Sequence, residues 1–135
     1  MEKLLVDTNI VIDLLSKREE FFQEAQELFT LADNNEVVLF VSALTFANTH
    51  YLLAKYQKLN EARKTLIKFK VLVNVAALDD KIVELALVSD FKDFEDAIQY
   101  HTALENEVDI IITRNKKDFK NSKLPVMTAK EYLKM

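Results

Sequence analysis

The sequence has 135 residues, half of them hydrophobic, and carries 22 acidic and 18 basic side chains for a net charge of −4. This length predicts one domain over residues 1–135, and the negative charge means that any nucleic-acid contact must use a local basic patch. The absence of cysteine and glycine excludes disulfides, thiolate zinc sites, glycine-rich phosphate loops and dinucleotide-binding motifs. We expect a soluble, cytoplasmic protein, because no apolar run is long enough for a signal peptide or a membrane span.

Short β-branched runs alternate with helical patterns along the chain. Strands are expected at residues 3–6, 37–41, 71–75 and 109–113, with a small edge strand at 125–127. Helices are expected from near Ile10 and over 19–32, 44–55, 60–69, 81–88, 94–105 and 129–133. This alternation predicts an α/β fold with a parallel sheet and helices on both faces. In such a fold the helices begin at the carboxyl edge of the sheet, where ligands bind.

Tight turns must be made without glycine, so they are expected at residues that tolerate left-handed backbone conformations. Asparagine does so better than most other residues. The candidate positions are Asn34, Asn35, Asn60, Asn106 and Asn121.

Acidic side chains stand at two expected helix starts on the carboxyl edge. Asp7 directly follows the first strand, and by itself it would be interpreted as a helix N-cap. In "DFED" at residues 93–96, Asp93 is the expected cap, Glu95 is expected to point outward, and Asp96 lies near the border of the buried face. Three acids in four residues are more than capping requires. The buried face of this helix is expected to carry Phe94, Ala97, Ile98, His101 and Leu104.

A third segment, "TRNKKD" at residues 113–118, brings Asp118 towards the same edge. Carboxylates gathered in this way repel one another, and a divalent cation would neutralise them. With no cysteine and only two histidines, the expected ion is Mg²⁺ or Mn²⁺ held by oxygen. Asp7 and Asp96 are the expected direct ligands. Asp93 and Asp118 are further catalytic candidates, with Asp118 acting through water.

Three blocks resemble the PIN domain family in order and spacing: "LLVDTNIVIDLL", "VSALTFANTHYLL" and "DFEDAIQYHTALENEVDIIITRNKKDF". The resemblance covers essentially the whole chain and includes the VapC-like ribonuclease toxins. It implies a three-layer α/β/α sandwich with a sheet of order 3-2-1-4-5. It also implies Mg²⁺- or Mn²⁺-dependent hydrolysis of RNA phosphodiester bonds, which leaves a 5′-phosphate and a 3′-hydroxyl. The implied partners are a second copy of the chain and an antitoxin protein, as in a type II toxin–antitoxin pair.

The resemblance also implies roles for particular residues. Its first acid falls on Asp7, supported by Asn9, and its third acid falls on Asp96. Its fourth position falls among Thr113, Asn115 and Asp118. Phosphate contacts are expected beside the site on Arg114, Lys116, Lys117, Lys120 and Lys123, and Lys17 and Arg18 could add to them.

The second acid of most VapC-like sequences is replaced here by Asn48. One subgroup of PIN domains resembles this chain in both "FANTHYLL" and "DFEDA". The resemblance to this subgroup implies that Asn48 and Glu95 are supporting residues of the site. The alternative is a PIN fold that has lost catalysis and binds RNA or protein. A phosphate-accepting receiver domain is disfavoured, because the first strand ends in a single acid.

Overall fold

The computed structural model describes residues 1–135 and contains one parallel sheet. Its strands are β1 (Lys3–Val6), β2 (Val38–Ser42), β3 (Asn74–Ala76), β4 (Ile110–Ile112) and β5 (Val126–Met127). They lie in the order β3-β2-β1-β4-β5, and every neighbouring pair is parallel. Leu5 of the central strand β1 is in register with Phe40 of β2 and Ile111 of β4. The predicted strand order is confirmed.

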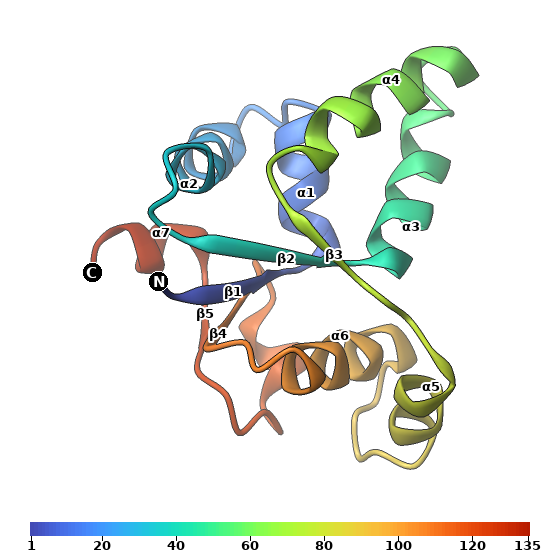
Figure 1. The fold of residues 1–135 in the computed structure, drawn as a ribbon, viewed down its shortest axis with the longest axis vertical. Coiled ribbons are helices and arrows are strands. Elements are labelled where there is room, and N and C mark those ends of the chain that lie inside the picture. Colours follow the sequence, from blue (N-terminus) through green and yellow to red (C-terminus); the bar gives the residue numbers. More distant parts are fainter.

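Helices cover both faces of this sheet (Figure 1). They are α1 (Thr8–Leu15), α2 (Phe22–Asp33), α3 (Ala43–Leu53), α4 (Leu59–Lys70), α5 (Asp80–Leu87), α6 (Phe94–Glu105) and α7 (Ala129–Leu133), with a 3₁₀ turn at Lys116–Phe119. In Figure 1, α1 to α4 lie on one side of the strands, and α5 and α6 lie on the other. The predicted three-layer α/β/α sandwich is therefore confirmed. No helix combines the length and the apolar character that crossing a bilayer requires.

The core follows from the alternation of side chains along the strands. Leu4 and Val6 of β1 face one way and pack in a cluster with Val11 of α1 and Leu28 of α2. Leu5 faces the other way and packs with Tyr100 of α6. All three β1 side chains are fully buried, as expected for the central strand of a sheet that is covered on both faces.

The predicted third strand begins too early in the sequence. Residues 71–73 form the turn after α4, and Val71 is 84% exposed, so that β3 begins at Asn74. The β-branched residues of this segment gave the strand pattern, but the turn that follows α4 occupies its first half.

The predicted buried face of α6 is wrong in part. Phe94 and Leu104 are exposed, by 44% and 40%. The helix lies between the sheet and α5, so it buries a wider band than a surface helix does, with Tyr100 packed in the sheet cluster and Ile98 packed in the α5 cluster. This band brings the polar side chain of Gln99 into the interior, where it is 2% exposed.

Three helices end in the same way although the chain has no glycine. After α1, α2 and α6, the residue beyond the C-cap adopts a positive φ: Lys17 at 51°, Asn35 at 58° and Glu107 at 54°. After α6, the Glu107 amide donates to Leu104 O at 3.1 Å and the Val108 amide donates to Ala103 O at 3.0 Å. This pattern is a Schellman motif, which usually has glycine at the left-handed position. Of the asparagines expected in such positions, only Asn35 has a positive φ.

Glycine at these left-handed positions is expected to stabilise the protein. Lys17→Gly and Glu107→Gly should each raise the free energy of unfolding by roughly 0.5–1 kcal/mol, because the Cβ penalty exceeds the entropy cost of glycine. Thermal melting should show an increase of about 2–4 °C for each variant. Asn35→Gly is the matched control and should gain less, because asparagine already tolerates this conformation. Lower melting temperatures for Lys17→Gly and Glu107→Gly would contradict the explanation.

Candidate active site

Asp7 occupies the carboxyl end of the central strand and is the N-cap of α1. Its amide donates to Ile112 O of β4 at 2.9 Å, which fixes the backbone between the two strands. Its Oδ1 accepts a hydrogen bond from the Thr8 amide at 2.8 Å, and its Oδ2 accepts one from Thr113 Oγ1 at 2.8 Å. The residue is only 7% exposed. The carboxylate of Asp7 therefore both caps α1 and forms part of the candidate site.

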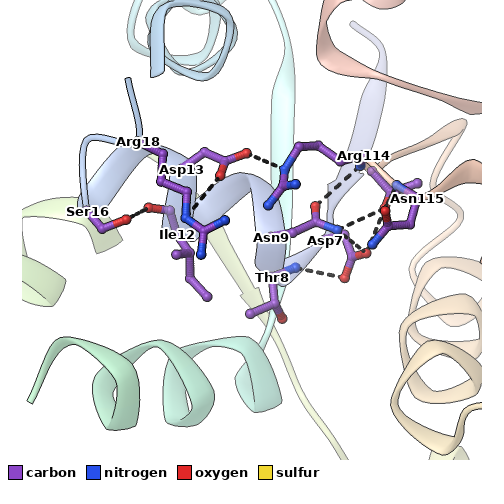
Figure 2. A network of polar contacts seen from close by, with 10 residues as sticks. Asp7, Thr8, Asn9, Ile12, Asp13, Ser16, Arg18, Arg114 and Asn115 are labelled. Atoms are coloured by element: carbon purple, nitrogen blue, oxygen red, sulfur yellow. Dashed lines mark hydrogen bonds and ion pairs between the residues drawn. The ribbon is translucent and has the colours of Figure 1, made fainter. Parts of the chain in front are cut away.

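Asn9 links this carboxylate to the loop after β4 (Figure 2). Its Nδ2 lies 3.4 Å from both Asp7 Oδ2 and Thr113 Oγ1, and its Oδ1 accepts from the Arg114 amide at 3.4 Å. Thr113 Oγ1 also accepts from the Asn115 amide at 3.1 Å. These contacts hold β1, α1 and the loop after β4 together at one point of the sheet edge.

A cavity of about 240 Å³ opens beside Asp7 at this edge. It is lined from α3 by Asn48 and from α6 by Glu95, Asp96 and Gln99. The other lining residues come from α1 and its cap, from the start of α3 and from the loop after β4: Asp7, Thr8, Asn9, Ile12, Leu44 and Asn115. We call this space the acidic cavity. It brings together segments from the beginning, middle and end of the chain.

A neighbouring cavity of about 270 Å³ shares Asp96 with the acidic cavity. It contains two more of the predicted acids, Asp93 and Asp118. Asp93 is the N-cap of α6, as expected, and its Oδ1 accepts from the Asp96 amide at 3.0 Å. Three basic side chains line the same space: Lys92, Lys117 and Lys120. We call this space the lysine cavity.

Burial, together with neighbouring negative charge, raises the pKa of both central carboxyl groups. Burial is the main reason why the pKa of Asp7 is above its usual value, and the charges of Asp118 and Asp93 raise it further, against the lowering effect of the Thr113 and Thr8 hydrogen bonds. Burial, followed by the charges of Asp7, Asp93, Asp118 and Glu95, raises the pKa of Asp96 to about 7. A bound cation would favour the charged forms of these groups.

Glu95 lies on the exposed side of α6, as predicted, but it also takes part in the site. Glu95 is solvent-exposed, but its Oε1 accepts a hydrogen bond from Asn48 Nδ2 at 3.2 Å, and both residues line the acidic cavity. Asn48 lies in the second turn of α3 and faces the first turn of α6. Its amide therefore meets a carboxylate that comes from another helix.

A polar network in the wall of the acidic cavity was not predicted from the sequence. Gln99 Nε2 donates to Thr45 Oγ1 at 2.9 Å and to Thr8 Oγ1 at 3.3 Å, and the two threonine hydroxyls lie 2.8 Å apart. Gln99 Oε1 is buried without a partner. Helical spacing could have found two of these residues, because Gln99 is three residues after Asp96 and Thr45 is three before Asn48.

The predicted phosphate contacts divide into two groups. Lys117 and Lys120 line the lysine cavity beside Asp96. Lys116 Nζ instead pairs with Glu131 Oε2 at 2.9 Å. Arg114 Nε pairs with Asp13 Oδ2 at 2.7 Å, and its guanidinium lies over the Phe21 ring at 4.3 Å, away from Asp7 (Figure 2). Asp13 is 1% exposed, so this ion pair is part of the structure of α1 and the loop after β4.

The donor set of the acidic cavity fits a hard divalent cation. Carboxylate and amide oxygens are the ligands that Mg²⁺ and Mn²⁺ take, and Mg²⁺ usually takes one or two carboxylates and keeps several waters. No three carboxylate or imidazole groups are close enough together to form a complete metal-binding group. Asp7 and Asp96 are the carboxylates best placed to hold an ion, and water would complete its coordination.

The fold and the site define an α/β protein with an acidic cavity at the carboxyl edge of a parallel sheet. A model of the PIN domain matches residues 3–117, and the chain belongs to the PIN domain family. It is 27% identical over 139 residues to Ribonuclease VapC1 of Aquifex aeolicus (strain VF5), an alignment that covers 97% of this chain and 93% of that protein.

Two solved structures show the same fold. A toxin–antitoxin complex from Klebsiella pneumoniae has a chain that is 29% identical, with a TM-score of 0.69 and coverage of 93% of this chain and 97% of that one. The DNA-bound VapBC from Salmonella typhimurium is 16% identical, with a TM-score of 0.72 and coverage of 96% and 99%. The fold match therefore extends over nearly the full length of these chains.

Proposed function

We propose that the protein is a metal-dependent endoribonuclease that hydrolyses RNA phosphodiester bonds. The observation that carries this proposal is the acidic cavity, in which Asp7 and Asp96 from two separate segments line one space at the carboxyl edge. The raised pKa values of both carboxyl groups support it, because buried carboxyl groups with perturbed pKa values that share one cavity are typical of functional sites. The likeness to a protein named Ribonuclease VapC1 supports RNA as the substrate.

Each part of the site has a chemical task in this proposal. Asp7 and Asp96 would hold Mg²⁺ or Mn²⁺, which activates water and stabilises charge on the phosphate oxygens when bound. Thr113 and Asn9 orient the Asp7 carboxylate through their hydrogen bonds. Lys117 and Lys120 of the lysine cavity would contact backbone phosphates without reading the sequence. Cleavage of the P–O3′ bond would leave a 5′-phosphate and a 3′-hydroxyl.

The partners belong to the same proposal. The similar solved structures are described as toxin–antitoxin and VapBC complexes, and we infer an antitoxin protein as partner. We also propose a homodimer in the cytoplasm. Exposed apolar side chains are available for such contacts on α5 and α6 and just after α5, namely Leu87, Val88, Phe94 and Leu104. Sedimentation of the purified chain should give the mass of a dimer, and a monomer at all concentrations would refute that part.

The activity can be tested on the protein as it is. We expect it to cut single-stranded RNA when Mn²⁺ or Mg²⁺ is added, to stop when a chelator is added, and to leave single-stranded DNA of the same sequence uncut. The products should carry 5′-phosphates, which a 5′-phosphate-dependent exonuclease would detect. RNA cleavage that persists in excess chelator, or products with 2′,3′-cyclic phosphates, would refute the metal-dependent mechanism.

A binding module without catalysis is the second candidate, and it is favoured by the neutral Asn48 in the cavity wall. Asn48→Glu distinguishes the two. If the wild type neither binds Mn²⁺ nor cleaves RNA and the variant does both, the site is a relic. If the wild type already does both, the amide belongs to a working site.

A further inference from the structure

In the wall of the acidic cavity, the carboxylate of Glu95 accepts a hydrogen bond from the neutral side chain of Asn48. Glu95 is at the surface, where a free glutamate loses side-chain entropy if it is fixed in one conformation. Its Oε1 is nevertheless turned to Asn48 Nδ2 at 3.2 Å. Hydrogen bonds to a charged group are among the stronger ones, so this contact can hold the carboxylate over the cavity.

The two residues are complementary in chemistry. An amide at position 48 donates a hydrogen bond to the Glu95 carboxylate, whereas a carboxylate at that position would repel it. The third helix therefore contributes the donor, and the sixth helix contributes the charge. The pair bridges α3 and α6 across the same cavity that Asp7 and Asp96 line.

Asp93 is the other acid of this segment, and its geometry does not fit the same task. Its Oδ1 caps α6 by accepting from the Asp96 amide at 3.0 Å, and its side chain lines the lysine cavity and not the acidic one. Of the acids in the first turn of α6, only Asp96 and Glu95 line the acidic cavity.

A second polar side chain in the wall of the acidic cavity has an atom without a hydrogen-bond partner. Gln99 is 2% exposed and lines this cavity, and its Oε1 has no hydrogen-bond partner. Exchanging the assignment of the amide oxygen and nitrogen does not remove the feature, because one amide atom contacts the two threonine hydroxyls and the other remains free. A buried polar atom without a partner is costly unless a ligand or its water satisfies it.

We propose that Glu95, positioned by Asn48, is the third carboxylate of the cation site and binds the ion through water. This inference rests on the proposed function, because it assumes that the acidic cavity holds a divalent cation. Asp7 and Asp96 remain the direct ligands, and Asn48 acts as a positioning residue for Glu95. The neutral residue at position 48 is then part of a working site.

Mn²⁺ affinity of the metal-free protein, measured by electron paramagnetic resonance titration, tests the proposal without using activity. Glu95→Gln should weaken Mn²⁺ binding by about tenfold or more, and Asn48→Ala should weaken it by a smaller factor, as for residues outside the direct ligand set. Combining Asn48→Glu with Glu95→Gln exchanges the amide and the carboxylate. This double variant should recover most of the affinity that Glu95→Gln loses.

Glu36→Gln is the matched control, because Glu36 is exposed and precedes β2 at the opposite edge of the sheet. It should bind Mn²⁺ like the wild type. If the wild type binds Mn²⁺ and cleaves RNA while Glu95→Gln binds equally well, the proposal for Glu95 is wrong and the proposed function stands. If the double variant binds no better than Glu95→Gln, the pairing with Asn48 is wrong. If the wild type itself binds no Mn²⁺, both the inference and the proposed function are overturned.

Discussion

Asp96→Asn is expected to reduce RNA cleavage by roughly 10²–10³-fold and to raise the melting temperature of the metal-free protein. The activity should fall because Asp96, a proposed direct ligand of the cation, loses its charge. The stability rises because burial and four neighbouring acids make the Asp96 charge unfavourable in the fold. The cap of α6 is unaffected, since Asp93 bonds the backbone amide of residue 96.

The pH dependence of this stability effect has a definite sign. Folding raises the pKa of Asp96 to about 7, so the folded chain holds this proton more tightly than the unfolded chain does. The contribution of Asp96 to the free energy of unfolding is therefore fully present below about pH 4 and is lost as the pH rises towards 7. Thermal melting at about pH 8 should show a gain of roughly 3 °C or more for Asp96→Asn, and little gain at about pH 4.

Mn²⁺ provides the control for this prediction. It should raise the melting temperature of the wild type and have little effect on Asp96→Asn, because only a ligand that binds the folded state stabilises it. Equal stabilisation of both proteins by Mn²⁺ would show that the ion binds elsewhere. A variant that is less stable than the wild type at about pH 8 would contradict the assigned electrostatics.

Arg114→Met is expected to be strongly destabilising. The variant leaves Asp13, which is 1% exposed, without the guanidinium that lies 2.7 Å away. Breaking a buried ion pair by removing one partner costs about 3–5 kcal/mol, and we expect the lower end because the Arg114 side chain is 24% exposed. Melting should occur roughly 10 °C lower than in the wild type.

The double variant Asp13→Asn with Arg114→Met is the control for this pair. It removes the buried charge together with its partner, so it should recover much of the lost stability. Burial already raises the pKa of Asp13, and the loss of Arg114 raises it further, so the single variant should be most destabilised at high pH and least at low pH. Equal melting temperatures of Arg114→Met and the wild type would place Arg114 among the free substrate contacts.

The fold could be predicted from local patterns that tertiary contacts did not override. The short runs of Leu4, Leu5 and Val6 and of Ile110 to Ile112 lie in central strands, where burial on both faces demands continuous apolar residues. The convergence of Asp7 and Asp96 also followed from topology, because strand ends and helix starts share one edge. Their roles as metal ligands remain a prediction.

The parts that could not be predicted depend on side-chain partners from distant segments. The pairing of Asn48 with Glu95 joins residues 47 positions apart, and the direction of a surface glutamate has no periodic signal. The pairing of Arg114 with Asp13 joins residues 101 positions apart, and no local pattern predicts it. Gln99 was missed because α6 packs against both the sheet and α5, and a single apolar stripe does not describe such a helix.

The most direct test of the account compares single-turnover RNA cleavage by the wild type and by Asp7→Asn in the presence of Mn²⁺. Asparagine keeps one oxygen that can accept from the Thr8 amide, and its amide nitrogen can donate to the Thr113 hydroxyl, so this variant should fold, and its melting temperature will verify that. The account predicts Mn²⁺-dependent cleavage by the wild type and a loss of roughly 10²–10³-fold in the variant. Equal cleavage by the two proteins would contradict it.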